Sequence, residues 1–374
     1  MHIAYFTDSN SFKSDALRDK HVSYQYPGSG WISCLYNIAK DYGVDIASGD
    51  VALEHVACGR WSAKDLLIVQ DMGCRRAYGL LQSGATPFMI TCFEAPLYAP
   101  FFHDSAHLIA ARFKLRCGFG LGEAGQNFGG SNISTQFKFP SFYLDDVLPV
   151  GSPADWRSRR RLALVAANKF KSTRIFLPRG SGPKDWLRQL KWQYWRAISR
   201  AYRNSLNACL HESRLKAIDY FGNNGGIDLY GAGWEAMGGL PLDWAKRLLL
   251  NRGITACGAC GSKLQTLRDY QYAICYENCA IPGYITEKII DCFVAGVIPI
   301  YLGAPDINQH IPAAAFLAPN ELDFSHLLSR MNRLDEYEAL SIIERGREYL
   351  NSTQGRLHSY EGFANAVLKV ALTC

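Results

Sequence analysis

The sequence predicts an α/β protein with two Rossmann-like domains that face each other across a cleft. Along the first half of the chain, short apolar runs alternate with helical stretches, the β-α-β-α order that builds a parallel sheet. A second series of the same kind begins after 145–161, where Leu-Pro, Gly-Ser-Pro and a basic run break the pattern. A length of 374 residues also favours two domains over one core.

The first domain is expected at 1–150, and 145–161 is expected to be the linker that follows it. Apolar runs predict its strands, and stretches of helical periodicity predict its helices. The predicted strands are Ile3–Thr7, Leu66–Val69, Phe88–Phe93 and Leu108–Ala111, and the predicted helices are Trp31–Asp41 and Arg75–Ser83.

The second domain is expected at 151–360. It opens on a continuous apolar run, Leu162–Ala167, which is typical of a strand buried on both faces of a parallel sheet. Further strands are predicted at Ile227–Gly231, Tyr272–Tyr276 and Val297–Leu302, and helices at Leu264–Tyr270, Thr286–Ala295, Glu321–Met331 and Leu334–Leu350. A separate C-terminal helix is expected within 361–374.

Composition is that of an ordinary soluble protein, with 48% hydrophobic and 20% charged residues. The start of the chain reads as a strand and not as a signal peptide, and no apolar run approaches the ~18–20 residues that cross a bilayer. We therefore expect a cytoplasmic protein, at most peripheral on the inner face of the membrane. Cys257-x-x-Cys260 followed by Cys275 and Cys279 resembles zinc-ligand spacing, but Cys275 falls in a strand pattern directed into a core. No metal site and no cofactor are expected.

The net charge of +6 is concentrated in a basic insertion at 174–207, which indicates an anionic partner. Its segment 184–203 combines tryptophans with cations, and two interpretations are open. It could be an amphipathic helix on a membrane surface that brings the protein to a lipid-linked acceptor, or a helical hairpin packed on its own domain. The tract contains no recognised nucleic-acid module, so no nucleic-acid partner is expected.

The most informative stretch is Tyr276–Pro305. It reads as a buried strand that ends in Glu277-Asn278, a Gly-Tyr turn, a helix that opens on Thr286-Glu287-Lys288, and a second buried strand. This order places an acid, a cation and helix N–H groups at the carboxyl ends of parallel strands, where phosphorylated ligands bind in open α/β sheets. The alternative is an ordinary βαβ unit with solvated charges.

These motifs resemble the C-terminal domain of glycosyltransferase family 10, the α-1,3/1,4-fucosyltransferases, and suggest a bacterial-type member. The matching segments are Tyr276-Glu277-Asn278, Tyr284–Lys288, Ala295–Gly303, Ile311-Pro312 through Phe316 and, upstream, Ser213-Arg214-Leu215 and Ile227–Gly231. The resemblance implies the GT-B architecture, with a nucleotide-sugar domain at 151–360 and an acceptor domain at 1–150.

The resemblance also implies roles for individual residues. Arg214 and Lys288 would contact the donor diphosphate, while Tyr284 and Asn278 would shape the donor pocket. Glu287 is the first choice for the ribose or the transferred sugar, and Glu277 the second, because a carboxylate accepts two hydrogen bonds from a diol. Asn168, Tyr230 and Thr286 complete the predicted donor-binding set. Ala167 and Gln271 replace a serine and a lysine of the family pattern, so a donor other than GDP-fucose stays open.

An inverting transferase needs a general base for the acceptor hydroxyl. By resemblance this is Glu94, in the turn Phe93-Glu94-Ala95-Pro96 after an apolar strand; the alternative is a surface carboxylate that caps a turn. His103 and Asp104 nearby are expected to be structural. The chain contains no Asp-x-Asp, the usual mark of a metal-dependent transferase.

Together these features predict an inverting, metal-independent transferase that moves fucose or a related sugar from a GDP-sugar to a glycan acceptor in bacterial surface polysaccharide synthesis. The alternatives are a transferase for another sugar nucleotide and a non-catalytic binding protein of the membrane surface. The letters Gly120–Gly125 fit a dinucleotide fingerprint, but the sequence that follows favours an acceptor-facing loop.

Overall fold

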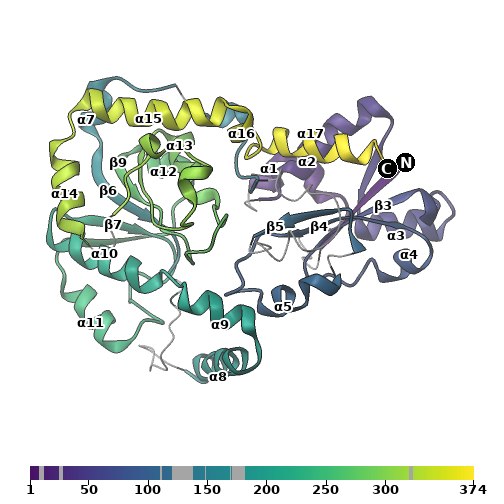
Figure 1. Cartoon of the computed structure of the whole chain (residues 1–374), viewed down its shortest axis with the longest axis horizontal. Helices are drawn as coiled ribbons and strands as arrows, with labels where there is room; N and C mark the ends of the chain where they lie inside the picture. The colour runs from purple at the N-terminus through teal and green to yellow at the C-terminus, as the bar shows by residue number, and fades with distance from the viewer. Residues whose placement is uncertain are drawn as a thin grey trace. The chain divides into compact units, whose positions relative to one another are not determined.

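The computed structural model describes residues 1–7, 12–24, 28–109, 112–119, 138–147, 149–168, 170, 182–319 and 323–374. The chain forms two compact α/β units (Figure 1). Unit 1 comprises Met1–Glu94, Phe101–Asp145 and Thr353–Cys374, and unit 2 comprises Ala95–Pro100 and Asp146–Ser352. The predicted fold class, α/β with two Rossmann-like domains, is confirmed. The loop expected at 120–125 and the start of the basic insertion, 174–181, lie outside the described residues.

Unit 1 is built on a sheet of five parallel strands in the order β2-β1-β3-β4-β5. Its strands are β1 His2–Phe6, β2 Asp45–Ser48, β3 Leu66–Asp71, β4 Thr86–Cys92 and β5 Leu115–Gly118. The strands are nearly continuous apolar runs because helices cover both faces of such a sheet. The chain winds outward in both directions from β1, so the strand order reverses between β1 and β3.

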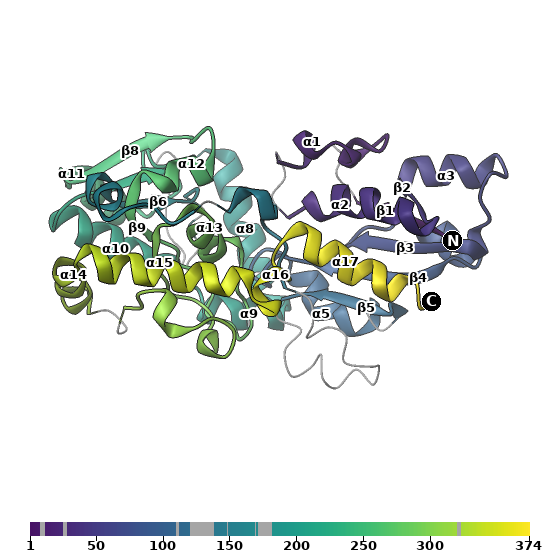
Figure 2. The ribbon, with the colours of Figure 1, turned by 90° about the horizontal axis from the view of Figure 1, so that it is seen from above.

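The helices of unit 1 include one from the far end of the chain. They are α1 Lys20–Tyr24, α2 Gly30–Ala39, α3 Gly49–Ala57, α4 Tyr78–Gln82, α5 Pro100–Ile109, α16 Thr353–Arg356 and α17 Tyr360–Ala371. In Figure 2 the yellow α17 lies along the purple α2. The rings of Trp31 and Phe363 are 5.1 Å apart between these helices, and both side chains are buried. The helix expected within 361–374 is therefore part of the core of unit 1.

Residues 353–360, which the sequence analysis grouped with the second domain, also lie in unit 1. The amide of Ser141 donates to the carbonyl of His358 at 2.8 Å, and Phe142 forms a parallel bridge with Ser359. These bonds join the end of the N-terminal half to the segment that leads into α17.

Two predictions for unit 1 differ from the structure. The strand predicted at Leu108–Ala111 is wrong: Leu108 and Ile109 end α5, which starts on Pro100, a residue suited to the first turn of a helix. The fifth strand is β5. The strand β2 and the helix α3 were not predicted, because β2 is only four residues long and carries a weak apolar signal.

Unit 2 contains a second five-stranded parallel sheet, in the order β10-β9-β6-β7-β8. Its strands are β6 Arg160–Val165, β7 Ile227–Tyr230, β8 Ile254–Gly258, β9 Tyr270–Ile274 and β10 Ile298–Ile300. Here the strand order reverses between β6 and β9, and ligands of open α/β sheets bind at the carboxyl ends of strands beside such a reversal. The edge strand β8 was not predicted because none of its residues is buried.

The helices of unit 2 are α7 Pro153–Ser158, α8 Pro183–Ile198, α9 Arg200–Asn207, α10 His211–Asn223, α11 Leu242–Leu250, α12 Lys263–Arg268, α13 Glu287–Ala295, α14 Phe324–Arg333 and α15 Glu336–Asn351. Short 3-10 turns lie at Ala16–Arg18, Lys40–Tyr42, Ala63–Asp65, Leu144–Asp146, Ile307–Gln309 and Ala313–Ala315. Within the described ranges, no helix combines the length and the apolar character needed to cross a bilayer.

Much of the expected linker 145–161 is ordered structure of unit 2. Ser152 and Asp155 form a reciprocal capping box around Pro153, which starts α7, and Arg160 begins β6. The Gly-Ser-Pro sequence is thus a helix start. The basic insertion also differs from a single continuous helix: it breaks at Ser199, whose side chain caps α9 by accepting a bond from the amide of Tyr202.

Candidate active site

The candidate site is centred on Glu277, just past the carboxyl end of β9. Its amide donates to the carbonyl of Leu302 at 2.8 Å, which extends the β9–β10 pairing by several residues. The side chain is completely buried. Burying a carboxylate costs free energy unless hydrogen-bond donors satisfy its oxygens. The hydrogen bonds of Glu277 therefore identify the groups that hold it in place.

The hydrogen-bond donors to Glu277 come from the start of α13. Glu277 accepts bonds from the amide of Thr286 at 2.8 Å, from the Thr286 hydroxyl at 2.8 Å and from Lys288 Nζ at 2.9 Å. The Thr286 hydroxyl in turn accepts a bond from Lys288 Nζ at 2.8 Å. Thr286 is the N-cap residue of α13, yet its side chain does not cap the helix amides. The positive end of the helix dipole therefore adds to the field of Lys288 at this point.

A second cation, Arg214 on α10, lies on the same strand end. Its guanidinium is buried and donates to the carbonyl of Tyr276 at 2.7 Å and, more weakly, to Asn278 Oδ1 at 3.4 Å. Burial lowers the pKa of Arg214, while the carboxylate of Glu277 is among the groups that raise it. Burial also lowers the pKa of Lys288, but Glu277 and Glu287 outweigh it and raise the pKa overall, so both cations stay charged near neutral pH.

Glu287, the first residue of α13, belongs to a second set of charges beside the first. Burial raises its pKa, but the ammonium groups of Lys288 and Lys263, each 3.8 Å away, lower it to about 2. Lys263 also pairs with Asp291 at 2.7 Å. Burial raises the pKa of Asp291 to about 6 despite this pair. Glu287 is thus an ionised, partly exposed carboxylate, whereas Asp291 takes up a proton about two pH units above the usual range of an aspartate.

The structure brings together most of the predicted donor-binding residues of unit 2. Arg214, Glu277, Asn278, Thr286, Glu287 and Lys288 form one connected group. Tyr284 is buried, and its phenol is among the groups that act electrostatically on Arg214. Glu277 differs from its predicted environment, because its oxygens face Thr286 and Lys288 and no solvent reaches them.

Two of the residues predicted to bind the sugar donor make their contacts outside the group around Glu277. Asn168 follows β6 and donates to the carbonyls of Gly233 and Gly238, at 3.2 and 3.0 Å, so that it holds the loop after β7. The hydroxyl of Tyr230 lies 3.0 Å from that of Tyr270, the first residue of β9. Tyr270 donates to Asp228 at 2.6 Å. The donor roles of Asn168 and Tyr230 stay predictions.

Glu94 lies in unit 1, two residues beyond β4, and is exposed. Its carbonyl lies 3.0 Å from Nε2 of His103 on α5, and the same nitrogen is 3.4 Å from Cys92 Sγ. Burial lowers the pKa of His103. The imidazole therefore holds the turn that carries Glu94, in keeping with a structural role, and the role of Glu94 as a base stays a prediction.

Lys263 and Asp291 are members of the cluster that the sequence did not indicate, and Gly303, which ends one of the matching motifs, was given no role. Asp291 could have been found, because it is four residues after Glu287 and so shares its helix face. Lys263 carries no local signal of this kind. A Cβ on Gly303 would lie 2.6 Å from Glu277 Cγ and 2.3 Å from Tyr301 Oη, closer than unbonded atoms approach.

This close approach gives a first prediction. Gly303→Ala should lower the free energy of unfolding by about 1–3 kcal/mol, because neither Glu277 nor Tyr301 has free space to move into. Urea denaturation followed by fluorescence measures the change. Gly261→Ala is the matched control, since a Cβ there meets no atom within 4 Å. Equal stability of the two variants would contradict the packing role of Gly303.

The pKa of Asp291 gives a second prediction. Its folded value of about 6 exceeds the unfolded value of about 3.9, so between these values the folded chain alone holds the proton. Its contribution to stability is therefore present at low pH and falls as pH rises through 6. The stability of the wild type relative to Asp291→Asn should drop by roughly 1 kcal/mol from pH 5 to pH 7. Denaturant titrations at several pH values measure this, and a pH-independent difference would refute it.

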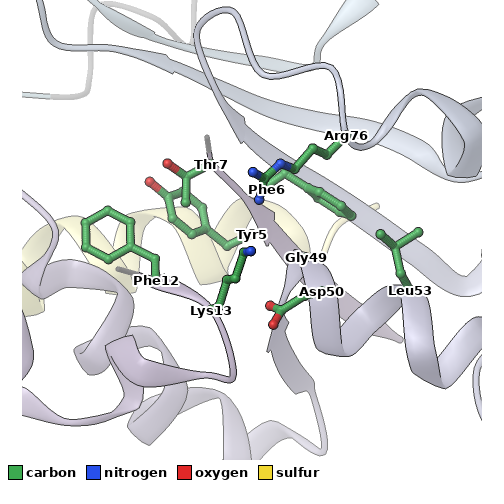
Figure 3. A pocket seen from close by; sticks show the side chains of 9 residues that line it. All are labelled: Tyr5, Phe6, Thr7, Phe12, Lys13, Gly49, Asp50, Leu53 and Arg76. Carbon is green, nitrogen blue, oxygen red and sulfur yellow. The ribbon is translucent and has the colours of Figure 1, made fainter. Parts of the chain in front are cut away.

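Unit 1 has a small cavity of its own, of about 220 Å³, at the carboxyl end of β1 (Figure 3). Lys13, Asp50 and Arg76 reach it from three different segments, next to the reversal of strand order. Asp50 accepts bonds from the amide of Ser14 at 2.8 Å and from Ser48 Oγ at 2.6 Å. Asp50 thus fastens the segment after β1, and the cavity is a candidate ligand position in unit 1.

All twelve cysteines are thiols in the structure. Cys275 is buried beside β10, where its sulfur lies 3.4 Å from the carbonyl of Ile300, while Cys257 belongs to β8 at the far edge of the sheet. In the part of the chain that the structure describes, no group of three or more His, Cys, Asp or Glu side chains is arranged to hold a metal ion.

Comparison with solved structures finds the same fold in several glycosyltransferases. Over the whole chain, the fold matches a glycosyltransferase from Rickettsia africae (TM-score 0.57, 10% identity, 97% of that chain). It also matches Anabaena HepE in complex with UDP-glucose (TM-score 0.56, 12% identity, 100% of that chain) and a sucrose-phosphate synthase from Thermosynechococcus elongatus (TM-score 0.58, 12% identity, 98% of that chain). At these identities the likeness concerns the fold alone.

Sequence comparison identifies the family of the C-terminal segment. Residues 207–341 match the family model for glycosyltransferase family 10 (fucosyltransferase) C-term, which confirms the resemblance seen in the motifs for this segment. The similar proteins include the alpha-(1,3)-fucosyltransferase FucT of Helicobacter pylori, 26% identical over 104 residues, or 28% of this chain and 22% of the relative. GDP-fucose protein O-fucosyltransferase 3 of Danio rerio is 35% identical over 83 residues, 21% of this chain and 18% of the relative. The matches thus span about a fifth of the length of these relatives.

Proposed function

We propose that the protein is an inverting fucosyltransferase that moves fucose from GDP-fucose to a glycan hydroxyl. The observation that carries the proposal is the pair of cations, the buried Arg214 and the Lys288 side chain that is 13% exposed, at the strand end around Glu277. Both residues lie inside the segment that matches the fucosyltransferase family. The related proteins are named for fucose transfer, which supports the choice of donor.

The charge balance of the cluster suits departure of a nucleoside diphosphate. When the glycosidic bond of the donor breaks, new negative charge develops on the diphosphate, and fixed cations stabilise it best where water is excluded. When no sugar nucleotide is bound, the charge of Lys288 is neutralised by Glu277, whose Oε2 lies 2.9 Å from the Lys288 Nζ. A diphosphate would share Lys288 and Arg214 with Glu277 and accept bonds from the first amides of α13. These groups would make a metal ion unnecessary.

Glu94 would remove the proton from the acceptor hydroxyl as the fucose is transferred. Glu94→Gln keeps the shape of the side chain but cannot accept the proton, so the transfer rate should fall by roughly 10²–10⁴-fold. The fall should appear in kcat more than in the KM for GDP-fucose, because Glu94 lies in unit 1 and the donor residues lie in unit 2. A fully active Glu94→Gln variant would refute this role.

The direct test is incubation with GDP-fucose and a panel of glycans, read by mass spectrometry, with and without a chelator. A product one deoxyhexose heavier, insensitive to the chelator, would support the proposal, and NMR of the product would show whether the linkage is inverted. Absence of product with every glycan, or loss of activity with the chelator, would count against it. We place the reaction in bacterial surface polysaccharide synthesis on the cytoplasmic side of the membrane, which deletion of the gene and analysis of the surface glycan would test.

The main alternative is that the sugar donor is a different nucleotide sugar, since HepE, which shares the fold, was solved with UDP-glucose. Thermal shift with GDP-fucose, GDP-mannose and UDP-glucose at equal concentration separates the two, because the ligand with the lower Kd stabilises the folded state more. A larger shift with UDP-glucose would favour this alternative. Nucleotide binding with no transfer to any acceptor would favour a non-catalytic binding protein.

Peripheral membrane contact is part of the proposal and rests on α8. Trp186, Leu190, Tyr194 and Ile198, spaced four residues apart, are 53%, 65%, 58% and 55% exposed and form a stripe along one face. Between 186 and 207 the chain has five cations and no acid. Such a face suits an anionic lipid surface. Flotation with phosphatidylglycerol vesicles should recover the wild type but not Leu190→Ser, while Leu250→Ser, exposed on α11, should still float. Equal flotation of both variants would refute this contact.

A further inference from the structure

A second cavity of unit 1, larger than the one at the carboxyl end of β1, has no role in the reaction proposed above. It has a volume of about 720 Å³, within the range of small-molecule sites, and lies between the segment after β3, helix α4 and helix α5. Its apolar lining includes Tyr78, Leu81, Phe101, Phe102 and Phe113. The floor is firmly packed, since Phe102 and Phe113 are each 5% exposed.

Two arginines give the cavity its charge. Arg75, in the segment after β3, and Arg112, just before β5, both line it and are both exposed. Neither guanidinium group forms an ion pair or hydrogen bond with another residue that the structure describes. The described residues around the cavity include no Asp or Glu. Two guanidinium groups without a carboxylate partner are a binding arrangement for a phosphate or carboxylate of a ligand.

Two aromatic rings are exposed on the same cavity. Tyr78 is 60% exposed and Phe101 is 57% exposed, and both line the cavity. Exposed apolar surface and aromatic lining of a concave site are features of ligand binding. A ligand that satisfies both features has an apolar body and an anionic group at one end.

The cavity is also close in the fold to the predicted base. Phe101 and Phe102 are followed on α5 by His103, whose Nε2 is 3.0 Å from the carbonyl of Glu94. On the sheet, β3 and β4 are neighbours: the amide of Met72 donates to the carbonyl of Thr91 at 2.8 Å. One helix and one pair of strand ends therefore support both the cavity and the turn that carries Glu94.

We propose that this cavity binds a lipid phosphate, with the apolar chain against the aromatic rings and the phosphate held by Arg75 and Arg112. The inference rests on the proposed transferase function and specifies its acceptor: a glycan attached through phosphate to an isoprenoid or acyl chain. A soluble oligosaccharide offers the cavity neither the apolar chain nor the anionic group that its lining matches.

The test is isothermal titration calorimetry of the full chain with farnesyl monophosphate, farnesol and inorganic phosphate. Farnesyl monophosphate should bind about tenfold or more tightly than either of the other two, because it fills the apolar and the charged part together. The double variant Arg75→Gln/Arg112→Gln should lose about tenfold or more of this affinity and keep its affinity for farnesol. Phe101→Ser should weaken binding of both farnesyl compounds.

Arg252→Gln, an exposed arginine in a turn of unit 2, is the matched control and should bind like the wild type. The proposal is overturned if farnesyl monophosphate shows no saturable binding, or if the double variant and the control bind it equally. Transfer to soluble glycans by a protein that does not bind farnesyl monophosphate would refute this inference alone. Binding without transfer from GDP-fucose to any acceptor would refute the transferase and leave the lipid-phosphate site standing.

Discussion

Glu277→Gln should lower the free energy of unfolding by roughly 3–5 kcal/mol, the usual cost of removing one partner of a buried ion pair. The variant keeps the volume of the side chain but removes the carboxylate that lies 2.9 Å from the Lys288 ammonium, which leaves it only Glu287 at 3.8 Å. Arg214 loses the same negative neighbour. Guanidinium denaturation of the full chain measures the change.

Two further measurements identify the cause of this loss. Adding Lys288→Met to Glu277→Gln should restore part of the stability, since the uncompensated cation is then gone. GDP should also stabilise Glu277→Gln more than the wild type, because its phosphates replace the missing negative charge. If the double variant is less stable than the sum of the two single changes implies, Glu277 and Lys288 do not act as a pair.

Lys288→Met should reduce kcat/KM for fucosyl transfer by on the order of 10²–10³-fold, the effect of removing one group that stabilises charge in a transition state. Lys288 lies at the start of α13, where the helix dipole acts with its ammonium, and its side chain is 13% exposed. Initial rates with GDP-fucose and the acceptor found in the glycan panel give the value.

Lys263→Met is the matched control for that change. Lys263 is also a cation beside Glu287, but its ammonium pairs with Asp291 at 2.7 Å, away from Glu277. Its loss should reduce kcat/KM by less than about tenfold, since it would act on the diphosphate only through Glu287. Equal losses in the two variants would assign the effect to the general charge of the region and not to Lys288.

The candidate site could be predicted to the extent that local sequence specifies it. The apolar run before Glu277 marks a strand end, and Thr286-Glu287-Lys288 marks a helix start. The topology alone therefore predicts that Glu277 and Lys288 lie close together. The direction of Glu277 could not be predicted. Whether a strand-end carboxylate faces a ligand or a neighbouring helix depends on packing, here on Gly303, which leaves room for its side chain.

The fold shows the same division between local and long-range information. Long apolar strands such as β4 and β6 could be predicted, whereas β8, which has no buried residue, could not. The apolar run at 108–111 fits a strand or a helix equally well, and only the helix start at Pro100 distinguishes them. The packing of α17 on α2 joins residues more than three hundred positions apart, which no local pattern reports.

That last contact sets an order of assembly for the nascent chain. The ribosome makes the strands of unit 1 first, yet the apolar face of α2 that includes Trp31 stays uncovered until α17 has been translated. All of unit 2 is synthesised in the interval. Unit 2 can therefore complete its core while unit 1 waits, the reverse of the usual N-terminal-first sequence. Chaperones that shield exposed apolar surface should bind the early half of this protein during its synthesis.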